Sequence, residues 1–312
     1  MTNLPFIRTL INNKLFEEFL SKIKAIHIST SQISLYRFLE IFFSQVKKDN
    51  IVERAHAMAF NFTLSVFPAI IFLFTLIPYI PIPDLSSTIM ETLRELMPAS
   101  MFMAAESTIF EILNIQHGGL LSFGFIFAMY TATNGNLAMI SAFNRCYSFP
   151  EQKSFIQRML KGIALTVFLV LIVCVSVSFS LVAKVYLDMV ESTLSLDGRF
   201  YFQLLYLLKY WTIFMVLFFA TSFIYYVAPA IPVKWSFFSG GALVAAVLIM
   251  VFTLFFSFYV DNFNSYNKVY GSIGTLIAFM IWLHAISMAL LIGFEINASL
   301  DMARREKFSG QA

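Results

Sequence analysis

Charged residues are scarce in this sequence. Asp, Glu, Lys and Arg make up 12% of its 312 residues, whereas an ordinary soluble domain carries about 25%. The deficit is uneven, because six stretches of 19 to 25 residues contain none of these four residue types. A membrane-spanning helix needs about 20 apolar residues, and the core of a soluble domain rarely uses uncharged runs of that length. The pattern therefore excludes a soluble enzyme and predicts an all-α, polytopic membrane helical bundle.

Cysteine is also rare, since Cys146 and Cys174 are the only two in the chain. The first lies near the predicted cytoplasmic end of a span and the second lies within a span, so no structural disulfide is expected. A metal site needs three or four convergent ligands. The four histidines are instead scattered along the chain, at His27, His56, His117 and His284. The sequence therefore predicts no metal site and no cofactor.

Motifs for catalysis are missing as well. The sequence contains no Gly-rich phosphate loop, no HExxH and no GxSxG, the patterns that would indicate phosphate transfer, a zinc protease or a serine hydrolase. The net charge of +3 is too small to indicate a surface for nucleic acid. We therefore predict that the chain is not an enzyme and has no nucleic-acid partner.

The six uncharged stretches are the predicted membrane spans. They cover residues 57–80, 118–142, 162–183, 210–228, 236–260 and 272–294. We expect a membrane domain at 57–294 between an N-terminal segment at 1–56 and a C-terminal tail at 295–312. The two termini and every second connection between spans together contain 16 Lys and Arg residues, and the remaining connections contain 4. Lys209, at the end of a span, is left out of this count. The positive-inside rule then places both termini in the cytoplasm, as an even number of spans requires.

Three further segments have a helical pattern. Leu35, Leu39, Phe42 and Val46 share one helical face and predict an amphipathic helix, which either lies on the inner leaflet or packs loosely in the cytoplasm. Residues 81–117 predict a periplasmic helical hairpin, with one helix after Ser86 and a second opening at Pro98. Small residues four apart, at Gly241/Ala245 and Ala242/Ala246, predict close contact between helices.

Polar side chains within and beside the spans gather toward the predicted cytoplasmic side. Such groups are costly in hydrocarbon and face the bundle interior or a wet cavity. The predicted substrate pathway comprises Asn61, Asn134, Asn136, Asn144, Arg145, His284, Glu295 and Asn297. The alternative is purely structural: hydrogen bonds between helices for the asparagines and for a neutral His284, and pairing of Glu295 with Arg145, Arg54 or Arg304.

Lys184 and Lys209 lie at the predicted outer ends of two spans. Their stems can lie along apolar surface while their ammonium groups reach the lipid headgroups. A binding site for a lipid phosphate is the second possibility for this pair.

Four ordered motifs resemble the YihY/BrkB family of bacterial inner-membrane proteins. They are AHAMAFNFTLSVFP at 55–68, NGNLAMISAFNRCY at 134–147, YYVAPAIPVKWSFFSGG at 225–241 and VYGSIGTLIAFMIWLHAISMALLIGFEINASL at 269–300. His284 and Phe294 depart from the family pattern, which has tyrosine and alanine there. The resemblance implies a multipass protein of the inner membrane.

The resemblance also bears on function. Members were once labelled transfer-RNA-processing ribonucleases, and members have been linked to envelope integrity and to moving lipids or other solutes. Nuclease chemistry needs converging carboxylates or histidines and a basic surface, which this sequence lacks. We therefore expect a transporter or flippase-like protein with membrane lipids as partners. The alternative is a scaffold that binds envelope-biogenesis proteins through the hairpin at 81–117.

Overall fold

The computed structural model describes residues 27–28, 33–79, 86–87, 89–91, 99–116, 118–145, 154–194, 198–229, 235–262 and 272–309. Two short strands, β1 (His27–Ile28) and β2 (Ile33–Ser34), pair antiparallel. Helices follow in this order: α3 (Leu35–Lys48), α4 (Ile51–Leu76), the 3-10 helix η1 (Ile77–Tyr79), α6 (Ala99–Asn114), α7 (Gly118–Asn144), α8 (Phe155–Leu194), α9 (Gly198–Val227), α10 (Gly240–Asn262) and α12 (Ser272–Ser309).

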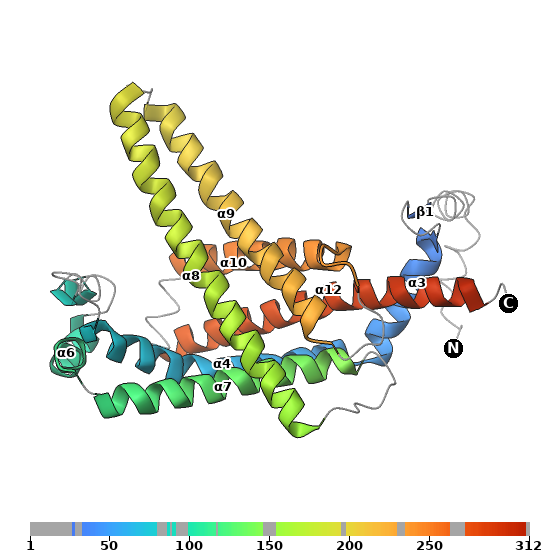
Figure 1. Ribbon diagram of the computed structural model, residues 1–312, viewed down its shortest axis with the longest axis horizontal. Helices are drawn as coiled ribbons and strands as arrows, with labels where there is room; N and C mark the ends of the chain where they lie inside the picture. The colour runs from blue at the N-terminus through green and yellow to red at the C-terminus, as the bar shows by residue number, and fades with distance from the viewer. Residues whose placement is uncertain are drawn as a thin grey trace.

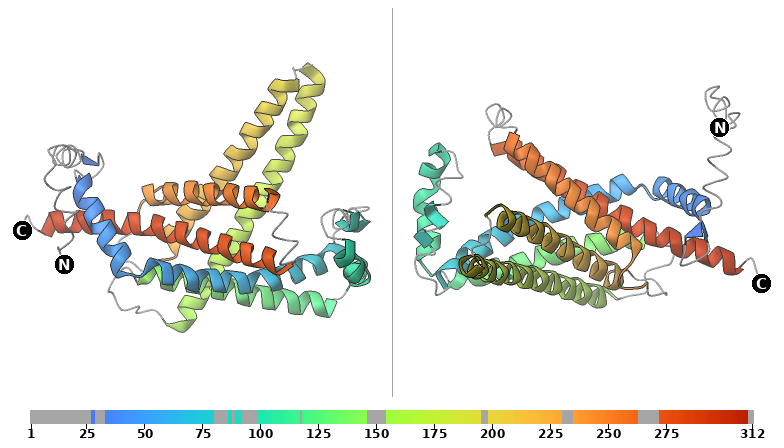
Figure 2. Two further views of the ribbon diagram at one scale, coloured as in Figure 1. Left: turned by 180° about the vertical axis from the view of Figure 1, so that it is seen from behind. Right: turned by 90° about the horizontal axis from the view of Figure 1, so that it is seen from above.

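Four of the helices, α4, α7, α10 and α12, run along the long axis of the molecule (Figure 1). Helix α4 packs against α7 and α12, and α10 packs against α12 and α9. Helices α8 and α9 cross the other four at a steep angle and continue beyond them as a long pair (Figure 2). Helix α3 and the C-terminal end of α12 lie at one end of the molecule, and α6 lies at the other.

Five helical segments of the described chain are long and apolar enough to cross a membrane. They are Ile51–Tyr79, Ile156–Ser176, Tyr210–Val227, Gly240–Tyr259 and Leu276–Glu306. The predicted class, a helical protein with several apolar spans, is therefore confirmed. The remaining predicted span forms α7, which is 27 residues long but less apolar, because its C-terminal half contains Thr131, Thr133, Asn134 and Asn136. The count of six spans and the cytoplasmic location of both termini stay predictions.

Helices α4 and α12 each extend beyond the predicted span and include a charged residue. Helix α4 begins at Ile51, ahead of the span predicted at 57–80, and so includes Arg54. Helix α12 has 38 residues and continues unbroken past Glu295, so the predicted boundary between span and tail falls inside a helix. These two charges, Arg54 and Glu295, form an ion pair with each other.

The pair of α8 and α9 is longer than a membrane is thick. Helix α8 has 40 residues, which at 1.5 Å per residue is about 60 Å, against about 30 Å for the hydrocarbon core of a bilayer. Helix α9 begins at Gly198, ahead of the span predicted at 210–228. Most of the connection predicted at 184–200 is therefore helical. The Nζ atom of Lys161 on α8 donates to the carbonyl oxygens of Ala228 (2.9 Å) and Pro229 (3.2 Å) at the end of α9.

The predicted amphipathic helix is confirmed as helix α3. It joins α4 through Asn50, whose φ of 45° lies in the left-handed region that Asn tolerates better than most residues. Helix α3 packs on the C-terminal part of α12, where Gln45 Nε2 lies 2.9 Å from Met302 Sδ and Arg37 Nη2 lies 2.9 Å from Glu306 Oε2. Phe43 on the same helix is 65% exposed. The location of α3 on the inner leaflet stays a prediction.

One arm of the predicted hairpin at 81–117 is described as helix α6 (Ala99–Asn114). The hydroxyl group of Ser86, from the first arm, donates to the carbonyl oxygen of Leu113 at 2.9 Å. Gln116 Nε2 donates to the carbonyl oxygen of Pro78 at 3.1 Å and so links the segment after α6 to the end of η1. Most of the first arm lies outside the described residues, and the periplasmic location stays a prediction.

Helices α10 and α12 approach each other closely through glycine, as the spacing of small residues predicts. A Cβ atom on Gly241 would clash with the backbone oxygen of Gly293, and one on Gly293 would clash with Tyr225 and Ala245. Ala242, Ala245 and Ala246 are fully buried in the same strip. The side chain of Asn297 completes the contact, because its Oδ1 atom accepts a hydrogen bond of 2.9 Å from the backbone N–H of Gly241 in the first turn of α10.

We predict that Gly241→Ala lowers the free energy of unfolding in detergent by about 1–3 kcal/mol, the usual cost of overpacking, because the added methyl group meets backbone of α12. Gly240→Ala is the matched control, since a Cβ atom there has nothing within 4 Å. Thermal unfolding of the two purified variants measures the difference. Equal stability of the two variants would contradict the close contact between α10 and α12.

Candidate functional site

The centre of the candidate site is an ion pair between α4 and α12. Arg54 Nη1 lies 2.7 Å from Glu295 Oε1, and the two side chains are 1% and 0% exposed. Pairing of Glu295 with Arg54 is one of the alternatives that the sequence left open, and the structure shows it. Two charges enclosed in a helix interface are costly to desolvate, so they persist only where each finds a partner.

A second carboxylate lies beside this pair. Asp49, at the end of α3, has its Oδ2 atom 3.9 Å from Arg54 Nη1, and its side chain is 11% exposed. Burial raises the pKa of Asp49, and the negative charge of Glu295 raises it further, while Arg54 and Lys48 lower it. One guanidinium group thus serves two carboxylates, and the longer distance makes Asp49 the more weakly held.

Two imidazole rings lie at the same interface. The rings of His56 on α4 and His284 on α12 are stacked, with centroids 4.3 Å apart and planes 15° apart. The Nδ1 atom of His284 is buried and makes no hydrogen bond among the described residues. The α4–α12 interface therefore contains two histidines as well as the ion pair.

Two of the predicted pathway asparagines connect neighbouring helices. Asn136 Nδ2 on α7 donates to Thr166 Oγ1 on α8 at 2.8 Å. Asn297 Nδ2 on α12 donates to Ser239 Oγ at the start of α10, also at 2.8 Å. These bonds are the interhelical hydrogen bonds that the structural alternative describes.

The other predicted pathway residues have more peripheral positions. Asn61 donates to the carbonyl oxygen of Ala57 within its own helix, at 2.8 Å. Asn134 and Asn144 are half-buried on α7, and Arg145 is exposed just after it. The hydrogen bonds, ion pair and ring contact given above each join one of the predicted residues to a residue outside the predicted set. A continuous pathway through them stays a prediction.

The predicted headgroup lysines, Lys184 and Lys209, belong to α8 and α9, but their side chains lie outside the part of the chain that the structure describes in atomic detail. Within the described residues, no group of three or more His, Cys, Asp or Glu side chains could hold a metal ion.

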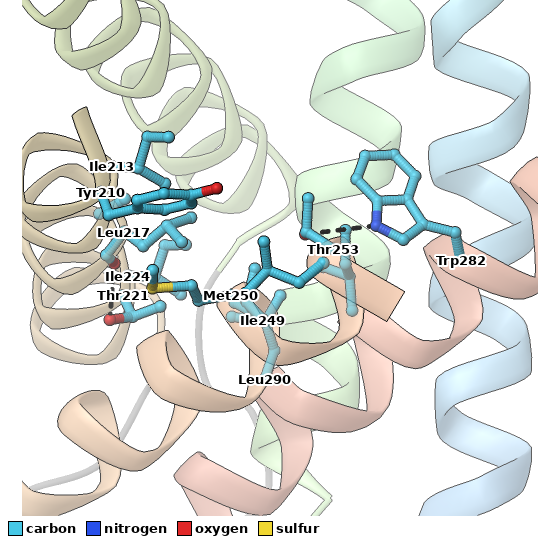
Figure 3. Close-up of a pocket in the computed structure, with 13 residues that line it drawn as sticks. Tyr210, Ile213, Leu217, Thr221, Ile224, Ile249, Met250, Thr253, Trp282 and Leu290 are labelled. Carbon is cyan, nitrogen blue, oxygen red and sulfur yellow. Dashed lines mark hydrogen bonds between the residues drawn. The ribbon is translucent and has the colours of Figure 1, made fainter. Parts of the chain in front are cut away.

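An apolar cleft lies on another side of α12, between α9, α10 and α12 (Figure 3). Its volume is about 430 Å³, and its exposed lining is entirely apolar. Helix α9 contributes Tyr210, Ile213, Leu217, Ala220, Thr221 and Ile224; α10 contributes Ile249, Met250, Thr253 and Leu254; α12 contributes Trp282, Ile286 and Leu290. Trp282 is held by a hydrogen bond of 3.3 Å from its Nε1 atom to Thr253 Oγ1.

Sequence reasoning missed Asp49 and the cleft. Asp49 precedes a helix in an ordinary polar stretch, and nothing in its neighbourhood signals burial. The cleft residues read as unremarkable apolar positions, because a cleft depends on how three helices pack rather than on any spacing along one of them. The only signal is that the lining residues share one face of a helix, as Trp282, Ile286 and Leu290 do on α12 and Ile213, Leu217 and Ile224 do on α9.

Asp49 generates a prediction about pH. The pKa of Asp49 is higher in the folded than in the unfolded protein, so folding favours the protonated acid. The stability that the protonated form contributes is therefore fully present below the unfolded-state pKa, and it is lost as the pH rises through the raised folded-state pKa. We predict that Asp49→Asn removes this loss and raises the unfolding temperature at neutral pH, because the cluster then contains one acid and one base. Thermal unfolding of both proteins from pH 3 to pH 8 measures the effect. If the two curves stay parallel throughout, Asp49 is not perturbed.

The chain is similar to known membrane proteins. Residues 42–312 match the family described as Virulence factor BrkB. The putative ribonuclease-like protein YfkH of Bacillus subtilis is 30% identical over 274 residues, which covers 86% of this chain and 96% of YfkH. A UPF0761 membrane protein of Vibrio campbellii is 32% identical over 99 residues, or 32% of this chain and 31% of that protein.

A second UPF0761 membrane protein, from Tolumonas auensis, is 35% identical over 77 residues, which is 25% of this chain and 26% of that protein. The chain thus covers about a third or less of these two UPF0761 proteins and nearly all of YfkH. No solved structure matches the chain. The family match spans most of the sequence, including α4, α12 and the cleft, and the resemblance seen in the four motifs is confirmed: the chain belongs to the BrkB family of membrane proteins.

Proposed function

We propose that this protein is a transporter or flippase-like protein of the bacterial inner membrane that moves a lipid or small solute across it. The observation that carries the proposal is the buried ion pair of Arg54 and Glu295 between α4 and α12. No ATP-binding motif is present in the sequence, so active transport would draw on a gradient or on a partner protein.

The energetic cost of the ion pair supports a functional role. Replacing a buried ion pair with apolar residues of similar volume is often neutral or stabilising, by up to about 4 kcal/mol. Stability alone therefore gives little reason for two enclosed charges at an interface of two apolar helices. Ionisable groups at membrane depth are most often part of a pathway for substrates, ions or protons. Asp49 lies beside this pair, and His56 and His284 add two further ionisable groups to the α4–α12 interface.

The cleft favours a lipid over a polar solute. It lies on α12, the helix that carries Glu295, and its exposed lining is apolar. An amphiphilic substrate needs contact with apolar surface for its chains and with polar groups for its headgroup. Helix α12 offers both, since Trp282, Ile286 and Leu290 line the cleft while His284 and Glu295 contact α4.

The second candidate function is a scaffold for envelope biogenesis. Helix α6 exposes Met103 (76%) and Phe110 (58%), apolar side chains that could bind a partner protein. Ribonuclease activity, which the printed name of YfkH mentions, receives less support, because nuclease chemistry usually relies on a metal ion and no group of three or more His, Cys, Asp or Glu side chains among the described residues could hold one.

We predict that Glu295→Gln reduces lipid movement at least several-fold in proteoliposomes without preventing insertion, since glutamine keeps the volume and can still accept a hydrogen bond from Arg54. The measurement is the loss of fluorescence of labelled phospholipids after dithionite is added outside. Wild-type protein should carry the loss beyond the half that empty vesicles show.

Glu306→Gln is the matched control for this experiment. Glu306 lies on the same helix and also pairs with an arginine, Arg37, but its side chain is 54% exposed. Lipid movement should be unchanged in this variant. A loss of fluorescence that stops at half for every protein would contradict unassisted phospholipid movement. Equal movement by wild type and Glu295→Gln would contradict a role of the ion pair in transport.

Deletion of the hairpin at 81–117 separates the two candidate functions. If the protein is a transporter, we expect the shortened chain to retain part of the lipid movement, because α6 lies at the opposite end of the molecule from α3 and the start of α4, the helix turn that carries Arg54 (Figure 1). If it is a scaffold, envelope proteins that co-purify with the wild type should be lost from the shortened chain while no lipid movement is seen in either protein.

A further inference from the structure

We infer that the cleft between α9, α10 and α12 holds one acyl chain of a bilayer phospholipid, which reaches it sideways from the membrane. The inference rests on the proposed function for its biological purpose. It names the acyl chain as the part of a lipid substrate that the cleft face of α12 would hold. Three features of the cleft carry the inference: its chemistry, its opening and its fixed wall.

The chemistry of the cleft matches a hydrocarbon chain. Its few polar groups already have partners: Thr221 Oγ1 donates to the carbonyl oxygen of Leu217 at 2.9 Å and lies 3.1 Å from that of Ala242, and Trp282 Nε1 donates to Thr253 Oγ1 at 3.3 Å. The volume of about 430 Å³ falls in the range of about 300–1,000 Å³ that small-molecule sites occupy. The site therefore offers space and apolar contact and gives a polar solute little to bind.

The cleft opens onto the apolar outer surface of the protein. Tyr210, Ile213 and Leu254 line it and are 38%, 40% and 46% exposed. The neighbouring surface carries Trp211 (58%) and Phe255 (68%), and α9, α10 and α12 all have segments apolar enough to cross a membrane. In a bilayer the open side thus faces hydrocarbon. Lipid chains fill it because an empty space would forfeit the dispersion contacts of its lining.

One wall of the cleft is fixed by aromatic packing. The ring of Trp282 stacks on Phe256 with centroids 5.2 Å apart and lies 5.6 Å from the ring of Phe279. Tyr210, Ile213 and Leu217 of α9 lie on the other side of the view from Trp282 (Figure 3). Because Trp282 is held from α10 and from its own helix, the cleft exists before a chain binds, which lowers the entropic cost of binding.

Trp282 also provides a native reporter. The chain has only three tryptophans, so Trp211→Phe with Trp235→Phe leaves Trp282 in the cleft, and Trp235→Phe with Trp282→Phe leaves Trp211 on the outer surface. Each protein is placed in nanodiscs with rising fractions of a phospholipid brominated on its acyl chain, which quenches nearby tryptophan. We expect brominated lipid to quench both tryptophans. Quenching of Trp282 should saturate at a low fraction of brominated lipid, whereas quenching of Trp211 should rise in proportion to that fraction.

A variant that fills the cleft tests the site directly. Ala220→Phe should lower the quenching of Trp282 at least two-fold and leave Trp211 unchanged, with Ala220→Leu as the milder variant if the first does not fold. Val251→Phe is the control, since Val251 on α10 is 37% exposed and does not line the cleft. Unchanged quenching of Trp282 in the filled variants would overturn the inference. Loss of Trp282 quenching in a cross-linked dimer would also overturn it, because a second copy of the chain would then cover the cleft.

The inference and the proposed function can fail separately. Saturable quenching of Trp282 without lipid movement in proteoliposomes would support the acyl-chain site and contradict transport. Lipid movement in the wild type and in Ala220→Phe alike, without saturable quenching, would support transport and contradict the site.

Discussion

One constraint organises the structure: Arg54 and Glu295 are both buried, so each charge needs the other as its partner. The pair joins the start of α4 to α12 in a region where neither side chain contacts solvent, so the two helices cannot separate without exposing a charge to an apolar environment. Removing a single partner of such a pair costs about 3–5 kcal/mol. Asp49 ties the turn between α3 and α4 to the same guanidinium group, and α3 in turn packs along the end of α12.

Helix α12 then organises the rest of the described chain through its different faces. Gly293 and Asn297 hold the start of α10 in close contact, and the carbonyl oxygen of Leu290 accepts a hydrogen bond of 2.6 Å from the Tyr225 hydroxyl group on α9. With α9 and α10 fixed at this end, they line the apolar cleft together with Trp282. The charged interface and the cleft are thus two consequences of how one long helix is packed.

Much of this arrangement follows from the sequence. Uncharged stretches located the apolar helices, and Gly241 with Ala245 predicted the tight contact of α10 because only small side chains permit it. Helices α4 and α12 run past the spans predicted at 57–80 and 272–294 and include Arg54 and Glu295, whose pairing across 241 positions the sequence offers only as one of three alternatives. Asn136 and Asn297 were recognised as important polar groups, but their partners, Thr166 and Ser239, depend on packing. The cleft had no counterpart in the sequence for the same reason.

The central claim is that the charges of Arg54 and Glu295 serve transport more than stability. The most direct test is the double replacement Arg54→Met with Glu295→Leu, which removes both charges and keeps the volume, measured in parallel for thermal unfolding and for lipid movement. Our account predicts an unfolding temperature close to that of the wild type, because apolar pairs substitute well for buried ion pairs, together with loss of lipid movement. Wild-type lipid movement by this well-folded variant would contradict it.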